Sequence, residues 1–229
     1  MTRRLMLVGV LLFFSHYLFA GDVATFVNLG FSPDSRFFMF GEYGLNSESK
    51  PYASIYGVNV PENVFVPNGV EQRTYGGALY PGENGFGALM NLYGSYVDLA
   101  KRMHIDHLAI GRELYLLIGG SEPQNELSFR DFLTGNDYLV RLKQTHYGSG
   151  AGIGSSDYID LTIKTKAGRT LVYLVGHPNL VRPGVENYRI REIILAPDNR
   201  SLVFVIEKHE VDRSGFNVRY MVETVRTGE

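Results

Sequence analysis

Residues 189–207 read RIREIILAPDNRSLVFVIE, and this stretch decides the fold class. Two apolar runs flank the corner Ala196–Arg200. In that corner, Pro197 presets the backbone for a turn, and Asp198 can accept hydrogen bonds from backbone groups just after it. Asn199 follows at a position that often needs a left-handed backbone. The pattern therefore predicts two strands joined by a tight turn.

The run after this corner is apolar on both faces. Alternate residues of a strand point to opposite sides, so one face carries Leu202, Phe204 and Ile206. The other face carries Val203 and Val205. Because half-solvated strands alternate between apolar and polar residues, a continuous apolar run predicts an inner strand that is covered on both sides.

Residues 31–40, FSPDSRFFMF, repeat this design near the N-terminus. Phe37 and Met39 are expected on one face of the second strand. Phe38 and Phe40 are expected on the other face, so this strand is also predicted to be covered twice. We interpret both corners as structural turns without a binding role. The residues expected to fix them are Pro33, Asp34 and Arg36 in the first corner and Pro197, Asp198 and Arg200 in the second.

Two blade-like units, at about residues 22–75 and 188–226, therefore bracket the chain after its N-terminal segment. Within and after the first unit, residues 61–85 are rich in Pro, Gly and Asn, a composition typical of turns and loops. From Phe86 to His104, apolar residues recur at three- and four-residue steps, which predicts a helix packed on a sheet. This helix belongs to an insert at about residues 86–120.

Residues 136–176 contain three segments in which apolar and polar residues alternate. Such alternation predicts antiparallel strands with one solvated face. We therefore expect a mostly β fold of antiparallel sheets, with blade-like N- and C-terminal units and one central helix. The sheets would form an incomplete or modified propeller or, alternatively, a β-sandwich. Residues 21–229 would form a single secreted domain.

The chain also carries two resemblances. Residues 31–40 with Ile55–Val60, and residues 195–204, resemble blades of the TolB or WD-repeat-like propeller type. The order of segments over about residues 22–210, including Ser128–Phe132, resembles the bacterial family of predicted secreted proteins called DUF2259. The second resemblance implies export and a shared fold. It implies no catalytic residue.

Composition and the N-terminal segment indicate which classes of protein and site to exclude and where in the cell to expect the protein. The chain has 22 Lys and Arg against 24 Asp and Glu, a balance that argues against an electrostatic nucleic-acid footprint. It has no cysteine, which excludes disulfides, thiol nucleophiles and Cys-ligated metal centres. Residues 1–20 combine Arg3 and Arg4 with an apolar run and a small-residue end, the layout of a cleaved signal peptide. We expect a secreted or periplasmic protein that meets the membrane only through this segment, if it stays uncleaved.

Few local patterns point to chemistry. His104, Asp106 and His107 are weak candidates for a metal site, but their position at a predicted helix end favours a surface role. Sequence alone leaves open whether the dispersed histidines converge with them; these are His146, His177 and His209. The loop Gly148–Gly154 lacks the helix that a nucleotide-binding glycine motif opens, and we expect it to join two strands.

Carboxylates for a hydrolase are dispersed, with Glu42, Asp131 and Glu192 as examples among which nothing in the sequence chooses. Asp131 is more typical of a turn or a helix cap. No catalytic residue and no cofactor are assigned. We expect a non-enzymatic binding or scaffold module that takes an envelope protein, peptide or glycan. Aromatic loop residues offer possible anchors: Tyr75, Tyr80, Tyr147 and Tyr158. The alternatives are an exported hydrolase acting on envelope carbohydrate or peptide, and a subunit of an envelope complex.

Overall fold

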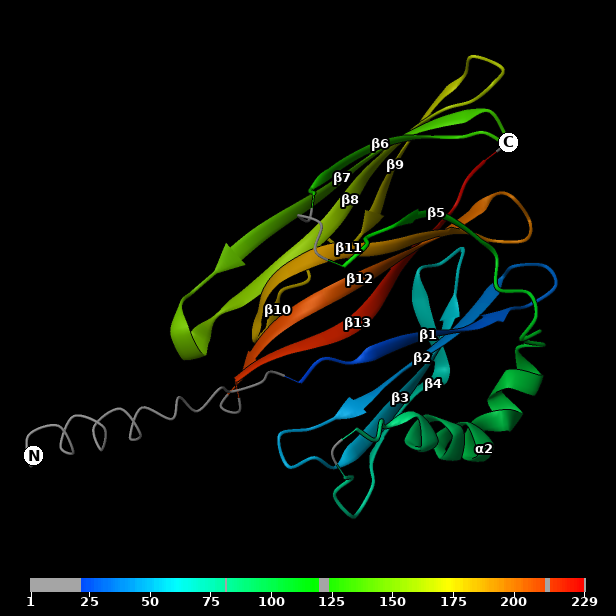
Figure 1. Cartoon of the computed structure of the whole chain (residues 1–229). Coiled ribbons are helices and arrows are strands. Elements are labelled where there is room, and N and C mark those ends of the chain that lie inside the picture. The colour runs from blue at the N-terminus through cyan, green and yellow to red at the C-terminus, as the bar shows by residue number, and fades with distance from the viewer. Residues whose placement is uncertain (1–21, 81, 120–123, 213–214, 229) are drawn as a thin grey trace, which may run out of the picture.

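The computed structural model describes residues 22–80, 82–119, 124–212 and 215–228. The predicted signal segment lies outside these residues. Within them the chain forms three antiparallel sheets and one α-helix, α2 (Phe86–Arg102) (Figure 1). The predicted fold class, mostly β with antiparallel sheets and a central helix, is confirmed.

The first sheet, which we call the N-terminal sheet, is a meander in the order β1-β2-β3-β4. Its strands are β1 (Thr25–Phe31), β2 (Phe37–Leu45), β3 (Pro51–Asn59) and β4 (Val64–Thr74). The assignment of residues 61–85 to loops was wrong for β4. The pairing with β3 jumps between Tyr56 and Val58, and Pro67 sits in that irregular stretch of an edge strand. An edge strand tolerates a proline at such a bulge because its missing N–H has no ladder partner to lose.

The second sheet, the middle sheet, has the order β13-β12-β11-β5. It combines the predicted C-terminal unit with a strand from the helix-containing insert. Its strands are β5 (Arg112–Leu116), β11 (Val185–Leu195), β12 (Ser201–Asp212) and β13 (Gly215–Arg226). Strand β13 lies at one edge, which is important for the site described below.

The third sheet, the outer sheet, contains the predicted central meander. Strand β8 pairs with β7 on one side and with both β9 and β10 on the other, and β6 pairs with β7. The glycine-rich loop joins β7 to β8 through a short 3₁₀ turn at Gly150–Gly152. The strands are β6 (Glu126–Asp131), β7 (Asn136–Tyr147), β8 (Gly154–Lys164), β9 (Thr170–Gly176) and β10 (Arg182–Pro183).

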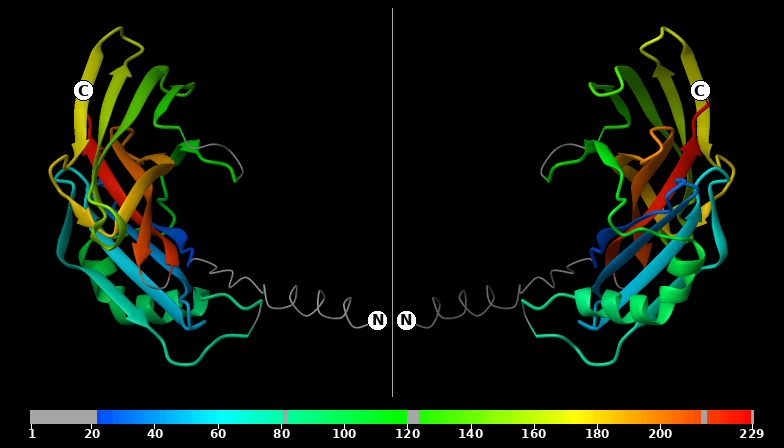
Figure 2. Two further views of the ribbon diagram at one scale, coloured as in Figure 1. Left: turned by 90° about the vertical axis from the view of Figure 1, so that its left-hand side faces the viewer. Right: turned by 90° about the vertical axis from the view of Figure 1, so that its right-hand side faces the viewer.

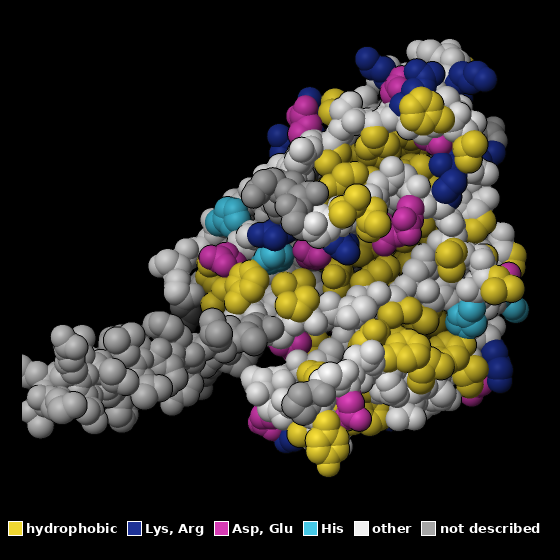
Figure 3. Space-filling model, in the orientation of Figure 1, with side chains coloured by type: hydrophobic (Ala, Val, Ile, Leu, Met, Phe, Trp, Pro, Cys, Tyr) yellow, Lys and Arg dark blue, Asp and Glu magenta, His cyan; other side chains and the backbone are white. Residues whose placement is uncertain are grey.

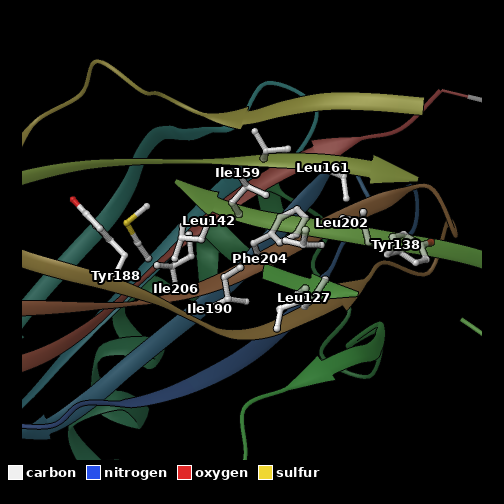
Figure 4. Packing of buried hydrophobic residues seen from close by; sticks show 14 of the residues in the cluster. Leu127, Tyr138, Leu142, Ile159, Leu161, Tyr188, Ile190, Leu202, Phe204 and Ile206 are labelled. Carbon is white, nitrogen blue, oxygen red and sulfur yellow. The ribbon is translucent and has the colours of Figure 1, made fainter. Parts of the chain in front are cut away.

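The middle sheet lies between the other two sheets. Phe204 and Ile206 pack in a core shared with β7 and β8 of the outer sheet, and Figure 4 shows these side chains meeting. Val203 and Val205 pack on the opposite side, in a core shared with Phe38 and other side chains of the N-terminal sheet. The prediction that this strand is covered on both faces is confirmed.

Strand β2 is covered twice as well. Phe38 and Phe40 face the middle sheet, whereas Met39 faces α2. The helix presents Leu89 and Leu92 to this second face, as the three- and four-residue spacing predicted. The layers are therefore outer sheet, middle sheet, N-terminal sheet and helix. The described residues form no closed propeller, and the stacked sheets fit the sandwich alternative.

The two proline-aspartate corners lie against each other. Ser35 and Asn199 occupy equivalent positions and have left-handed φ values of 54° and 55°. The Ser35 hydroxyl is buried and accepts a hydrogen bond from the Asp198 N–H at 3.1 Å. Within each corner, Asp34 and Asp198 accept the N–H groups of Arg36 and Arg200. This contact joins the N-terminal sheet to the middle sheet where both hairpins turn.

Phe204→Ala tests the double burial of β12. Phe204 has no exposed surface, so the substitution should lower the free energy of unfolding by about 3–5 kcal/mol through lost burial and a residual cavity. Phe132→Ala is the matched control, because Phe132 is 87% exposed and its loss should change stability by less than about 0.5 kcal/mol. Urea unfolding followed by circular dichroism measures both. Equal losses in the two variants would contradict the layered packing.

Candidate functional site

Two of the three weak metal candidates, Asp106 and His107, use their side chains in structural hydrogen bonds. His107 contacts the Leu29 carbonyl through Nδ1 and the Tyr93 hydroxyl through Nε2. Since a carbonyl only accepts, Nδ1 carries the proton and Nε2 accepts from the tyrosine. The Asp106 carboxylate accepts the Leu108 N–H, and His104, two positions after the last residue of α2, has a left-handed φ of 54°. The described part of the chain contains no group of three or more His, Asp or Glu side chains placed to hold a metal.

The other histidines and the carboxylates named above have separate surroundings. His209 is buried against Phe216, and His146 pairs across strands with Ser155. Asp131 forms a two-pronged ion pair with Arg112 at 2.8 and 2.9 Å and also accepts the Leu133 N–H, as a turn residue does. The Arg112 guanidinium holds the pKa of Asp131 down, to about 2.

Glu192 lines a hollow of about 570 Å³ beside β5. Burial raises the pKa of this carboxyl to about 7, and the nearby Glu113 carboxylate adds to the effect. Two neighbouring carboxylates of this kind are the residue types that acid–base hydrolysis uses. The causes of this shift are burial and the charges of Glu113 and Arg191, and they include no hydrogen bond that would orient the carboxyl. Glu192 is one of the three dispersed carboxylates named from the sequence, and nothing in the sequence favours it over Glu42 or Asp131.

A cavity of about 400 Å³, which we call the junction cavity, lies where all three sheets meet. The turn between β3 and β4 and the segment between β9 and β10 border it, beside β13, and both views of Figure 2 place these segments close together. Its lining comprises Tyr56, Val58 and residues 63–65 from the N-terminal sheet, His177, Leu180 and Arg182 from the outer sheet, and Lys208 and residues 220–222 from the middle sheet.

A buried charge cluster forms one side of the junction cavity. Arg182 on β10 donates to Asp157 on β8 at 2.7 Å and to Glu223 on β13 at 3.2 Å. Asn63, in the turn between β3 and β4, donates to the second oxygen of Glu223. The side chains of Asp157 and Glu223 are 0% and 3% exposed. One guanidinium therefore joins the outer sheet to the middle sheet, and Asn63 extends the link to the N-terminal sheet.

Burial dominates the protonation of this cluster. It raises the pKa of Asp157 to about 7, although the Arg182 charge works against this rise and the Glu223 charge supports it. The pKa of Glu223 is also raised by burial, while hydrogen bonds from Asn63 and Arg182 oppose the change. One oxygen of Asp157 is buried without a hydrogen-bond partner. The cluster thus holds two carboxyl groups beside one guanidinium. These carboxyl groups lose their protons at a higher pH than exposed carboxyl groups do.

Glu42 forms the other boundary of the site. Its carboxylate lies buried between β2 and β13 and accepts the Tyr56 hydroxyl at 2.9 Å and the Tyr220 N–H at 2.8 Å. Burial raises the pKa of Glu42. Tyr56 and Tyr220 both line the junction cavity, so the two hydrogen bonds of Glu42 hold two residues of the lining in place.

Sequence reasoning missed Asp157, Arg182 and Glu223. A signal was present for Glu223, because it is a charged residue inside the apolar run that starts at Tyr220. A charge in a strand covered on both faces is rare unless it is paired. No local pattern identifies its partners, which are 41 and 160 positions away in the sequence.

The raised pKa of Asp157 predicts a pH dependence. Between about pH 4 and pH 7 the folded protein holds a proton that the unfolded chain has released, so the free energy of unfolding falls as the pH rises through this window. Asp157→Asn removes that titration. The stability of the variant relative to the wild type should therefore increase from pH 4 to pH 7 and then stay level. Urea unfolding at pH 4.5, 5.5, 6.5 and 7.5 measures the difference, and a difference that is constant or decreases with pH would contradict the assignment.

Comparison with known proteins identifies the family of the chain. No helix among the described residues has the length and apolar character needed to cross a membrane. No curated protein and no solved structure matches the chain. A family model described as predicted secreted protein, DUF2259, matches residues 39–226. The chain therefore belongs to the DUF2259 family of predicted secreted proteins.

Proposed function

We propose that this protein is a non-enzymatic binding module of the bacterial envelope and that its ligand occupies the junction cavity. The observation that carries the proposal is the cavity itself, whose volume of about 400 Å³ lies within the range of ligand sites in proteins. It combines apolar walls with a few polar side chains. That combination gives a ligand both buried apolar contact and a fixed orientation.

The walls are built from elements that other contacts hold in place. Phe65 contacts the Tyr56 ring at 5.7 Å between centroids, and Tyr56 is in turn fixed by Glu42. Arg182 is held by two carboxylates. A site whose walls are ordered before binding loses little conformational entropy when a ligand enters. The aromatic residues of the site are thus Tyr56, Phe65 and Tyr220, and none of the tyrosines named from the sequence lines the cavity.

Binding fits this geometry better than catalysis does. The basic side chains in the lining are His177, Arg182 and Lys208. The Arg182 charge is already paired, Lys208 donates to Glu210 at 2.7 Å, and both oxygens of Glu223 accept hydrogen bonds. A hydrolytic site needs an acid–base group or a nucleophile aimed at the substrate. His177 is then the lining residue that would have to act, without a described partner to orient its ring.

A hydrolase acting on envelope carbohydrate or peptide is the second candidate, and one observation favours it. The pKa of Glu192, raised to about 7, suits a general acid at neutral pH. Release of nitrophenol from nitrophenyl glycosides tests it directly. Activity that disappears in Glu192→Gln and survives in Glu186→Gln, a change in the same strand, would replace our first proposal.

The proposal also states where the protein acts and which class of ligand it binds. We place the mature protein in the periplasm or outside the cell, because its family is one of predicted secreted proteins. The ligand would be an envelope protein, peptide or glycan. Nucleic acid does not suit it, since the face in Figure 3 intersperses basic and acidic side chains and the formal net charge is -2. Stable co-purification with one envelope protein would instead indicate a subunit of a complex.

Val64→Arg tests the cavity as the ligand site. A fragment set screened by ligand-observed NMR should give hits whose affinity falls about tenfold or more when the long arginine side chain covers the cavity. Val70→Arg is the matched control, because Val64 and Val70 are both β4 valines with 44% exposure and only Val64 lines the cavity. Hits that bind Val64→Arg as tightly as the wild type would contradict the proposal.

A further inference from the structure

The outer edge of β13 faces the junction cavity, and three of its outward N–H groups already donate hydrogen bonds. The Val218 N–H donates to the Asp22 carbonyl at 2.8 Å, and the Tyr220 N–H donates to Glu42 at 2.8 Å. The Thr224 N–H donates to the Asn63 side chain at 2.7 Å. Three of the four outward N–H groups from Val218 to Thr224 are therefore paired with groups from the N-terminal part of the chain. Occupied edge groups of this kind protect a sheet from adding strands of other molecules.

Val222 is the exception. Alternate residues of a strand direct their N–H and C=O groups to the same side, so Val222 shares its outward direction with Tyr220 and Thr224. Val222 lines the junction cavity. Among the described residues, no hydrogen bond reaches its N–H or its carbonyl from the outer side. Val222 thus offers both an N–H donor and a C=O acceptor, between two residues whose N–H groups are already paired.

We infer that the junction cavity binds a short extended peptide through one residue pair with Val222. This inference rests on the proposed function and specifies its ligand. In an antiparallel hydrogen-bonded pair, two residues exchange both of their N–H···O=C bonds. One residue of the ligand would accept from the Val222 N–H and donate to the Val222 carbonyl. Because Glu42 and Asn63 occupy the neighbouring donors, the ladder cannot extend beyond this pair.

The walls on either side of Val222 fit the side chains of such a peptide. Successive side chains of an extended segment point in opposite directions. Val64 and Phe65, which are 44% and 49% exposed, line the wall on the N-terminal sheet. Leu180, which is 49% exposed, lines the wall beside the outer sheet. Both walls are apolar where they meet solvent, so we expect uncharged apolar residues in the ligand.

Charge favours a neutral ligand as well. Arg182 is already paired with the two buried carboxylates beside it, and Lys208 is paired with Glu210. A charged ligand group would have to compete with these short ion pairs. A backbone amide competes with none of them and satisfies two main-chain groups that are otherwise left without a protein partner. Main-chain pairing then supplies orientation, and the apolar walls supply selectivity.

The test uses a defined pool of peptides. We would add acetylated tripeptide amides, with Val, Leu, Ile or Phe at each position, to the ¹⁵N-labelled mature protein and follow the Val222 amide by NMR. We expect the Val222 signal to shift and its hydrogen exchange to slow about tenfold at saturation. A second pool, N-methylated at the central residue, lacks one donor and should bind about tenfold more weakly.

Controls distinguish this inference from the broader proposal. Val64→Arg should abolish the shift and Val70→Arg should preserve it. No shift of the Val222 amide at 5 mM peptide (about the weakest affinity NMR detects), or equal binding of the N-methylated pool, would overturn the peptide inference. If fragments still bind in the cavity, the proposed function survives that result. A shift with N,N′-diacetylchitobiose and none with peptides would also overturn the inference, and would assign the amide-binding edge to an N-acetylated sugar.

Discussion

Strand β12 is buried on both faces along residues 202–206, and the rest of the structure follows from that constraint. A sheet with two apolar faces needs a cover on each side. Each large apolar side chain buried in this way contributes about 1.5–3 kcal/mol. The outer sheet covers one face of the middle sheet and the N-terminal sheet covers the other. With no cysteine in the chain, packing of this kind has to supply the stability that disulfides give many secreted domains.

A covered sheet still has edges, and the site arises at one of them. Strand β13 ends the middle sheet, so its outward N–H groups would be left without partners inside the stack. The N-terminal part of the chain supplies Asp22, Glu42 and Asn63 to three of these groups. Glu42 and Asn63 do this by crossing from the N-terminal sheet to the middle sheet. The same contacts that join the two sheets therefore form the ends of the junction cavity.

How far the sequence predicts this structure depends on the range of the interactions. Local patterns predicted the two doubly covered strands, both corners and the α2 face, because alternation and helical periodicity are properties of neighbouring residues. Strand β4 was missed because its Pro67 and Gly69 look like loop residues, and the pairing with β3 that tolerates them is a tertiary contact. Arg182, Asp157 and Glu223 were missed for the same reason. Their cluster exists only after three sheets have been brought together.

The composition of that cluster supports the binding role that we propose. Replacing a buried ion pair with apolar residues of similar volume is often neutral or stabilising, so stability alone does not require Arg182 between two carboxylates. One Asp157 oxygen also remains without a partner, which is unfavourable for folding. The cluster provides a directional contact that apolar packing would not. Arg182 on β10 is paired with Asp157 on β8 and with Glu223 on β13, and Glu223 directly follows Val222 in the sequence. A rigid wall beside an open hydrogen-bonding position is useful when another molecule has to fit between them.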